Sequence, residues 1–491
     1  MNSQKWALLL KINLGVFVLI VLQGCNSSQK QYREHLVFKY NEHSNIATLD
    51  PAFARNPQTI WPSNQLFNGL VQLDDQLNIQ PDIAKSWHIN DSTSTYTFTL
   101  RDDVYFHKNK VFKKDSTRSV LAQDFVYSFD RLLSPELASP GSWVFNAVQR
   151  YHAANDSTLV IQLKKPFPAF LGLLSMRYCS VVPKEAIAYY GNDFRSNPVG
   201  TGPFVFKFWE ENVKLVLRKN PIYFEKDAQG NKLPYLEAVA ITFLPDKQSE
   251  FLQFAQGNID FMTGLDNSYK DEIITTKGAL QPKYKDRVKL ITTPYLNTEY
   301  LGFFMGSTSQ EIASPLIRQA INYGFDREKM VTYLRNGMGI AATHGFIPKG
   351  LAGFDSIQGY SYNPEKARAL INAYKQATGA TTIQVTIGTN SQYLDLCEYI
   401  QRELEKLGIS ITIDVMPPAT LRQLKSSGEL DIFRASWVAD YPDAENYLSL
   451  FYSPNFTPNG PNYTHFKNIA FDSLYVEAQK ISQINKRKLL Y

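Results

Sequence analysis

The C-terminal half of the chain alternates between two hydrophobic periods, and this alternation limits the possible folds more than any other feature of the sequence. Residues 383–387 and 409–415 are predicted strands. Residues 393–407 carry apolar side chains every three to four positions and are followed by Gly408, as in a helix that ends there. A further strand is predicted at residues 432–439. Strands that alternate with helices pair mostly in parallel, so we expect an α/β lobe with a largely parallel sheet.

Charged side chains lie in and directly after the last of these strands. Arg434 lies within the apolar run 432–439, and Tyr441-Pro-Asp443 ends the strand because proline cannot donate to a ladder. Asp440 is therefore held at a carboxyl end of the sheet, where ligands of such sheets bind. Two interpretations remain open. Arg434 and Asp440 grip the two ends of a zwitterion with Trp437 as an apolar wall between them, or both are surface residues that pair with other protein groups.

Length and charge narrow the class of protein. A chain of 491 residues is expected to form roughly two to three domains. Its 20% charged and 44% hydrophobic residues are ordinary for a soluble globular protein. Lys5 and Lys11 contribute two charges to the net charge of +5. The net positive charge that remains without these two lysines is too small to indicate a nucleic-acid partner.

The N-terminus has the pattern of an export signal. Lys5 and Lys11 precede an apolar run at residues 12–22 that is too short for a settled membrane span, and the run ends in Leu22-Gln-Gly-Cys25. This ending resembles the lipobox of bacterial lipoproteins, in which the cysteine becomes the first mature residue and carries the lipid. We expect a signal peptide at residues 1–24, a lipid on Cys25 and a polar tether over residues 25–35. The alternative is a buried cysteine after a signal-anchor helix.

Shorter elements are predicted in the rest of the chain. We expect strands at residues 36–40, 95–101, 158–163, 204–209, 213–218 and 238–244. We expect helices at residues 56–70, 120–133, 169–174, 248–256, 314–325, 326–335 and 363–374, and a compact turn or short helix at residues 81–87.

Sequence signatures of several enzyme and cofactor classes are absent. The chain has no phosphate-binding glycine motif, no GxSxG or HExxH motif, and no zinc-ligand spacing among its cysteines and seven histidines. Cys179 and Cys397 are either a disulfide or two separate buried thiols. No cofactor is expected. Asp440, Asp443 and Glu445 remain a possible carboxylate set for glycoside hydrolysis or a metal site.

Ten short motifs in a fixed order carry a family resemblance over almost the whole mature chain. They are Leu49-Asp-Pro51, Leu66-Phe-Asn-Gly-Leu70, Pro81-Asp-Ile-Ala-Lys-Ser-Trp87, Tyr96-Thr-Phe-Thr-Leu-Arg101, Ala122-Gln-Asp-Phe-Val-Tyr-Ser-Phe-Asp-Arg131, Gly200-Thr-Gly-Pro-Phe204, Arg218-Lys-Asn-Pro221, Gly257-Asn-Ile-Asp260, Arg318-Gln-Ala-Ile321 and Trp437-Val-Ala-Asp-Tyr441. With them the chain resembles the large solute-binding proteins of ABC importers, in the oligopeptide, dipeptide and nickel-binding family (extracellular solute-binding protein family 5).

The resemblance implies a fold and a division into lobes. The fold is the two-lobed periplasmic-binding-protein-like α/β fold of type II, in its large peptide-binding class. Residues 36–292 would form the first lobe, with an extra subdomain inserted at about 65–180, and residues 293–491 the second. The family normally continues through a final strand that returns to the first lobe, so we expect that the sequence is truncated. At residues 106–109 the family's usual turn glycine is replaced by Asn109.

The resemblance also implies a function and a set of ligand contacts. Such a protein is not an enzyme. It is a monomer in the cell envelope, anchored by lipid to a bacterial membrane and facing the periplasm or cell exterior, and it captures short peptides for a membrane permease. In peptide-binding members the aspartate of W-x-x-D receives the α-amino group and an arginine three residues before the tryptophan pairs with the carboxyl end. These roles belong to Asp440 and Arg434 here, with Trp437 lining a side-chain pocket.

Further ligand contacts are implied in the first lobe. The segment around Arg55 to Pro57 would supply main-chain contacts, and Trp143 would cover the ligand. Other solutes remain open within the same family: a nickel chelate, haem, an oligosaccharide or a signalling peptide. An adhesin or sensor with the same fold is a further alternative, as is the carboxylate-dependent hydrolase.

Overall fold

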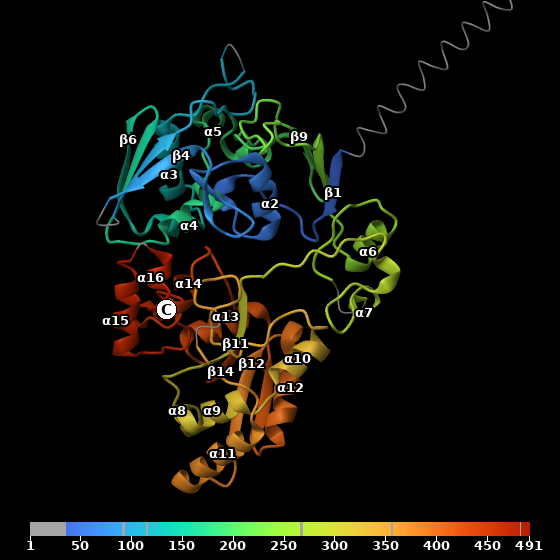
Figure 1. Cartoon of the computed structure of the whole chain (residues 1–491), viewed down its shortest axis with the longest axis vertical. Coiled ribbons are helices and arrows are strands. Elements are labelled where there is room, and N and C mark those ends of the chain that lie inside the picture. Colours follow the sequence, from blue (N-terminus) through green and yellow to red (C-terminus); the bar gives the residue numbers. More distant parts are fainter. Residues whose placement is uncertain (1–35, 91–93, 114–115, 266–268, 355–356, 482) are drawn as a thin grey trace, which may run out of the picture.

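The computed structural model describes residues 36–90, 94–113, 116–265, 269–354, 357–481 and 483–491. In these ranges the chain forms two lobes, one above the other in Figure 1. We call the upper group of elements before residue 245 lobe I and the lower group after residue 296 lobe II. The predicted signal peptide, Cys25 and the tether lie outside the described residues. Among the described residues, no helix combines the length and apolar character that a membrane crossing requires.

The main sheet of lobe I joins strands from both ends of the lobe. Its order is β1 (Val37–Asn41), β10 (Ala238–Thr242), β9 (Lys214–Lys219) and β8 (Phe204–Glu210). β1 runs parallel to β10, and the other neighbours are antiparallel. The first four residues of β10 are all buried, as expected for a central strand covered on both faces. The first strand of the lobe is therefore fixed by a segment about 200 residues further along the chain.

A second sheet of lobe I is antiparallel throughout. It consists of β4 (Ala84–Ile89), β5 (Thr95–Leu100), β7 (Thr158–Leu163) and β6 (Val148–Asn155), in that order. In β5 and β7 every second residue is buried, so each strand turns one apolar face to the core. Helix α3 (Ala122–Leu133) packs Phe125 and Phe129 into the same core.

The other elements of lobe I are short. The helices are α2 (Pro57–Leu66), α4 (Phe170–Leu174) and α5 (Lys184–Tyr190), and a hairpin is formed by β2 (Val71–Leu73) and β3 (Ile79–Pro81). Single turns of 3-10 helix are η1 (Pro51–Phe53), η2 (Ser142–Phe145), η3 (Arg177–Cys179) and η4 (Gly191–Ser196).

Two expectations for lobe I are wrong. Residues 81–87, predicted as a compact turn or short helix, end β3 and enter β4, because Asp82 turns inward to bond Asn68 and Gly69 and the chain then pairs with β5. The helix predicted at residues 56–70 ends at Leu66, since Phe67 is already extended. Tertiary pairing overrides local propensity at both places.

Lobe II is built on a four-stranded sheet. Its order is β11 (Asn297–Phe303), β14 (Ile432–Val438), β12 (Gln384–Thr389) and β13 (Ser410–Val415). β14, β12 and β13 are mutually parallel, which confirms the expectation of a largely parallel sheet, whereas β11 is an antiparallel edge strand that the sequence analysis did not predict. The helices are α8 (Gln310–Ala313), α9 (Pro315–Tyr323), α10 (Arg327–Leu334), α11 (Pro364–Thr378), α12 (Leu394–Glu405) and α13 (Pro418–Ser427).

A small unit beside both lobes contains α6 (Lys247–Ala255), α7 (Lys270–Ile273) and η5 (Pro282–Tyr284) (Figure 1). It reaches lobe I through Asp260, whose carboxylate accepts from the Lys39 N–H at 2.8 Å. It reaches lobe II through Lys270, whose Nζ donates to the Leu334 carbonyl at 3.3 Å. The boundary near residue 292 therefore follows a segment that contacts both lobes, and it stays a prediction.

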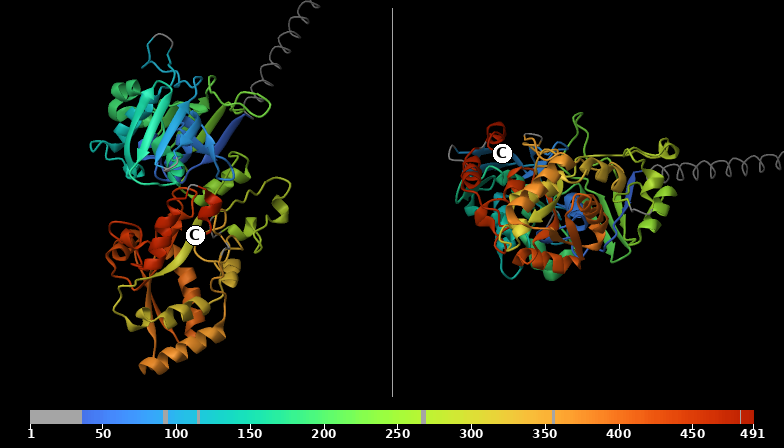
Figure 2. Two further views of the ribbon diagram at one scale, coloured as in Figure 1. Left: turned by 60° about the vertical axis from the view of Figure 1, so that its left-hand side comes forward. Right: turned by 90° about the horizontal axis from the view of Figure 1, so that it is seen from below.

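The C-terminal elements lie at the end of lobe II that faces lobe I (Figures 1 and 2). They are α14 (Glu445–Leu448), η7 (Ser453–Asn455), α15 (Ile469–Ala478) and α16 (Ile484–Arg487). Figure 1 places α14 and α16 next to α4 of lobe I.

Candidate functional site

Asp440 is positioned by the end of β14. The antiparallel ladder with β11 continues one residue past the strand, because the Ala439 N–H donates to the Leu296 carbonyl at 2.9 Å. Tyr441 and Pro442 then turn the chain, as predicted. The Asp440 residue remains exposed at this turn. The structure therefore places it where the sequence analysis expected, beyond the carboxyl end of a central strand.

The side chain of Asn446, on α14, holds this turn together. Its Oδ1 accepts from the Trp437 indole Nε1 at 2.8 Å and from the Asp440 backbone N–H at 3.1 Å. Its Nδ2 donates to Asp440 Oδ2 at 3.3 Å. Only 4% of Asn446 is exposed, so these bonds form away from bulk water. Trp437 and Asp440 are thus joined through one buried amide.

The environment of the Asp440 carboxylate favours its neutral form. The surrounding protein removes part of its hydration, which raises the pKa of Asp440, and the hydrogen bond from Asn446 opposes that rise. No basic side chain is among the groups that shift this pKa. A cation placed against the carboxylate would recover the cost of burying its charge.

The turn after Asp440 contacts lobe I directly. Tyr441 is 8% exposed and belongs to the hydrophobic core of lobe I, where its ring centroid lies 6.2 Å from that of Phe167. Tyr441 and Pro442 also lie against Gly172 of α4, so closely that a side chain at Gly172 would meet Tyr441 Cβ at 3.1 Å. Asp440 therefore lies at the junction of the two lobes.

Three loops of lobe I come together on the other side of this junction. The Ser139 hydroxyl donates to the Ala52 carbonyl at 2.5 Å, and Gly141 lies flat against the ring of Tyr178. Burial raises the pKa of the Tyr178 hydroxyl, the charge of Arg55 opposes this rise, and the charge of Asp440 adds to it. Arg55 and Asp440, predicted from distant parts of the sequence, therefore both act on one hydroxyl.

Trp143 and Pro57, the other two residues of lobe I that were predicted to contact the ligand, lie in different surroundings. Trp143, on η2 in the same loop as Gly141, is 37% exposed and free to face a solute. Pro57 is the first residue of α2, next to the Asn56 cap whose side chain accepts from the Thr59 N–H at 3.1 Å. Its local surroundings give Pro57 a role in starting the helix, and its ligand contact stays a prediction.

Arg434 already has a protein partner. Its guanidinium forms an ion pair with Glu299 on β11, a diagonal neighbour on the same face of the sheet, and stacks over the ring of Tyr393. Only 8% of Arg434 is exposed. Its Nε is buried and has no hydrogen-bond partner among the described residues. Part of the guanidinium therefore has no hydrogen-bond acceptor among the described residues.

The two other carboxylates of the segment have structural partners. Asp443 pairs with the buried Arg487 and accepts from the Tyr491 hydroxyl at 2.7 Å. Glu445 accepts hydrogen bonds from the hydroxyls of Tyr441 and Tyr475. Both are therefore committed to the packing of the C-terminal elements, unlike Asp440.

The two described cysteines do not form a disulfide. Cys179 is buried in lobe I and Cys397 in lobe II, and both are free thiols. This resolves the two alternatives left by the sequence. In the part of the chain that the structure describes, His, Cys, Asp and Glu side chains form no group of three or more suited to a metal ion.

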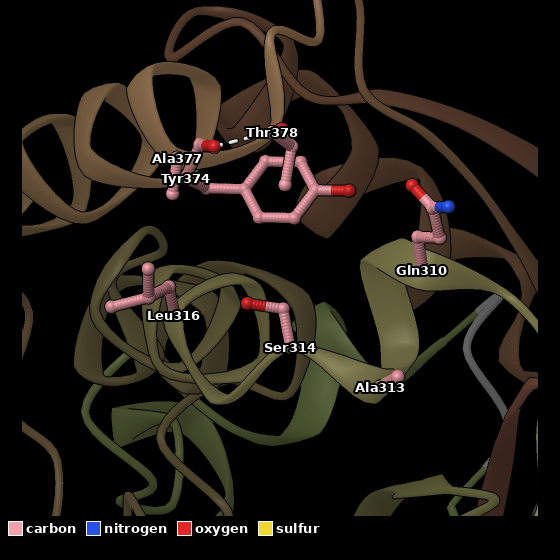
Figure 3. A pocket seen from close by; sticks show the side chains of 7 residues that line it. All are labelled: Gln310, Ala313, Ser314, Leu316, Tyr374, Ala377 and Thr378. Carbon is pink, nitrogen blue, oxygen red and sulfur yellow. Dashed lines mark hydrogen bonds between the residues drawn. The ribbon is translucent and has the colours of Figure 1, made fainter.

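A surface depression lies elsewhere on lobe II, between α8, α9 and α11 (Figure 3). Gln310, Ser314 and Tyr374 line it, and the Thr378 hydroxyl is turned back to bond the Tyr374 carbonyl at 2.8 Å. It carries no charged side chain and lies at the end of lobe II away from lobe I (Figure 1), so we place the candidate site at the junction.

The sequence analysis missed three residues of the site. Asn446 lies in the same polar segment as Asp440, but no motif or spacing distinguished it from its neighbours. Tyr178 lies on η3, between α4 and α5, and belongs to none of the sequence motifs. Tyr447, on α14, donates to the Leu296 carbonyl at 2.5 Å, and the charge of Asp440 is one of the causes that raise its pKa. Their proximity to Asp440 exists only in the folded chain.

Comparisons with known proteins identify the family of this chain. A family model described as bacterial extracellular solute-binding proteins, family 5 Middle, matches residues 78–459. The chain is 26% identical over 454 residues to the glutathione-binding protein GsiB of Salmonella typhi, covering 91% of this chain and 84% of that protein. It is 28% identical over 450 residues to the heme-binding protein A of Haemophilus influenzae, covering 87% and 79%.

Solved structures include the periplasmic binding protein DppA of Helicobacter pylori in complex with the peptide STSA. It is 25% identical, with a TM-score of 0.70 over 93% of this chain and 88% of that one. The predicted two-lobed fold is therefore confirmed. The family match covers more than half of the sequence. The chain belongs to family 5 of the bacterial extracellular solute-binding proteins, which are the substrate-binding components of ABC importers and not enzymes.

Proposed function

We propose that this protein is anchored by a lipid on Cys25, captures short peptides between its two lobes and delivers them to a membrane permease. The observation that carries the proposal is the Asp440 carboxylate, which is held by Asn446 at the junction of the lobes without a basic partner among the groups that shift its pKa. An ammonium group is the natural partner for such a carboxylate. The anchor rests on the Leu22-Gln-Gly-Cys25 pattern alone.

The amino end of the peptide would bind at Asp440. Its ammonium would balance the charge of the carboxylate, and a close pair recovers the several kcal/mol that desolvating each charge costs. Trp437 and the exposed Trp143 supply apolar surface near the first side chains. The peptide main chain would lie extended and bond to the protein main chain, so its sequence would matter little.

The carboxyl end would reach Arg434, whose Nε is buried without a partner among the described residues. Residues 434 and 440 are six positions apart along a strand and its extension, or roughly 20 Å. The two side chains shorten that span when they reach toward each other. The arrangement thus suits peptides of a few residues.

Native mass spectrometry of the protein without its signal peptide and lipid tests the solute class. The protein is purified without refolding so that it retains what it bound in the cell. A ladder of masses that match assorted short peptides is the expected result. One discrete mass that matches a haem, a metal chelate or a sugar would overturn the peptide proposal and leave the family unchanged.

Replacing Asp440 tests the amino-end contact. We expect Asp440→Asn to weaken the binding of free peptides by at least about tenfold, because an amide cannot balance the ammonium charge. Calorimetry with trialanine and N-acetyl-trialanine separates this charge effect from packing. The variant should lose most of the wild-type preference for the free peptide.

Asp414→Asn is a suitable control for this measurement. It removes one exposed carboxylate from β13 of the same lobe and should leave both affinities unchanged. Equal affinities of Asp440→Asn and wild type for trialanine would show that the amino end binds elsewhere.

A further inference from the structure

Asn446 touches the proposed ligand-binding carboxylate with the donor end of its amide. Its acceptor end is fixed by two other groups, the Trp437 indole N–H at 2.8 Å and the Asp440 backbone N–H at 3.1 Å. Two donors converge on Oδ1, so the amide cannot flip without losing both bonds and presenting N–H to N–H. The Nδ2 group must therefore point at Asp440 Oδ2, where it lies at 3.3 Å.

We propose that Asn446 is a positioning residue for ligand recognition: it orients the Asp440 carboxylate toward the junction of the lobes and helps to keep it ionised for the ammonium group of the ligand. The inference rests on the proposed function. Asn446 is 4% exposed and belongs to α14, which is itself fixed by the Asp443 and Glu445 networks. The orientation of Asp440 is thus tied to the packed C-terminal elements.

The chemistry requires an amide at this position. Partial loss of hydration raises the pKa of Asp440, and the hydrogen bond from Asn446 is the interaction that opposes the rise. A carboxylate in place of the amide would keep an acceptor for Trp437 and for the Asp440 N–H. It would lose the donor and place a second negative charge beside Asp440, which favours protonation of the pair.

The other titratable groups of this region are tyrosines, an arginine and a buried carboxylate. The pKa values of Tyr178, from lobe I, and Tyr447, from α14, are raised. Arg55 is the charged group of lobe I that acts on Tyr178. Glu445 has a raised pKa because of its burial, and its hydrogen bonds from Tyr441 and Tyr475 do not involve Asn446. A difference in pH profile between wild type and an Asn446 variant therefore reports on the Asp440 carboxylate and the side chain at position 446 that contacts it.

The test compares Asn446→Asp and Asn446→Ala with the wild type in trialanine binding between pH 4 and pH 8. Binding requires an ionised Asp440, so the affinity falls on the acidic side. We expect the pH at which half of the affinity is lost to move up by about one unit in Asn446→Asp, because the pKa of Asp440 rises. We expect Asn446→Ala to bind trialanine about tenfold more weakly at pH 7 and to lose part of its preference over N-acetyl-trialanine.

Asn462→Asp is the matched control. Asn462 is fully buried in the same C-terminal segment, where its Nδ2 donates to the carbonyls of Tyr452 and Phe466, and no hydrogen bond joins it to Asp440. This variant should lower the melting temperature and leave unchanged the pH at which half of the affinity for trialanine is lost. A purely structural role of Asn446 predicts the same behaviour for Asn446→Asp.

The outcomes separate this inference from the proposed function. If the pH at which half of the affinity is lost is the same in Asn446→Asp as in the wild type, and Asp440→Asn binds weakly, the proposed role of Asn446 is overturned and peptide capture is not. Wild-type trialanine binding by Asp440→Asn would overturn both. A titration of the aspartate carboxyl ¹³C signals in ligand-free protein, with Asp440→Asn to assign the signal, tests the inference without any ligand. The signal of Asp440 should titrate at higher pH in Asn446→Asp.

Discussion

At the scale of single residues, the contact of Arg434 with Glu299 limits how much of the arginine charge is available to a ligand. Glu299 neutralises part of its charge from the neighbouring strand, and Tyr393 covers one face of the guanidinium. A ligand carboxylate at Arg434 would therefore share the cation with Glu299. Glu299 is the more exposed partner, with 38% of its side chain accessible, so the protein can lose this partner at little cost to its packing.

We expect Glu299→Gln to strengthen the binding of peptides with a free carboxyl end by about threefold to tenfold, because the Arg434 charge is then available to the ligand. The affinity for C-terminally amidated peptides of the same sequence should not increase.

Arg434→Ala should weaken the binding of peptides of one preferred length and leave the binding of other lengths unchanged. Calorimetry over peptides of two to five residues measures both effects, and an equal loss at every length would assign Arg434 a structural role.

At the scale of secondary-structure elements, the junction of β1, β10 and α6 concentrates buried charge. Glu42 directly follows β1, His43 lies next to it, and both approach Lys247 and Glu250 on α6. Glu250 is fully buried; its carboxylate lies 3.2 Å from His43 Nε2 and forms an ion pair with Lys247 at 3.7 Å. Burial and the charge of Glu250 raise the pKa of Glu42 to about 7, while Lys247 opposes the rise.

This raised pKa makes the stability of lobe I depend on pH. The folded protein holds a proton on Glu42 more tightly than the unfolded chain does, so the free energy of unfolding falls as the pH rises from about 4.5 to about 7. Glu42→Gln removes this effect and should stabilise the protein by about 2 kcal/mol at pH 8. At pH 4 it should change stability little. Urea unfolding at the two pH values measures this, and equal effects at both would contradict it.

At the scale of the whole molecule, the two lobes meet through the turn that follows Asp440. Tyr441 enters the core of lobe I, and the C-terminal helices of lobe II lie at the end of that lobe that faces lobe I (Figure 2). The unit formed by α6 and α7 contacts both lobes at the other side of the junction (Figure 1). Any closure of the lobes over a solute must proceed around these two contacts, and we expect the crossover segment near residue 293 to act as a hinge.

Gly172 offers a test of this junction, because its missing side chain makes room for Tyr441 and Pro442. We expect Gly172→Ala to push the turn away by a few tenths of an ångström and to weaken peptide binding by about twofold to tenfold through the displaced Asp440. Far-UV circular dichroism should remain that of the wild type. Small-angle scattering with and without trialanine shows whether closure is reduced. Unchanged affinity would mean that the junction tolerates the shift.

The sequence by itself determined the elements whose signal lies within a short window. The strands of lobe II from β12 onward, the amphipathic α3 and α12, and the position of Asp440 at a strand end follow from apolar periodicity and from the breaking effect of proline. The ordered motifs indicated the family and hence the two-lobed fold. Such elements can be predicted from a short window, because each residue interacts with neighbours that the sequence places beside it.

Only the tertiary structure decided which partners these residues have. Asn446 holds Asp440, Glu299 neutralises part of the charge on Arg434, and β11 adds an edge strand to the sheet. The charges of Arg55 and Asp440 both act on Tyr178. The stretch at residues 81–87 became strand for the same reason. Most of these contacts join residues more than 100 positions apart, so their energies depend on how the lobes pack, and no local pattern in the sequence contains that information.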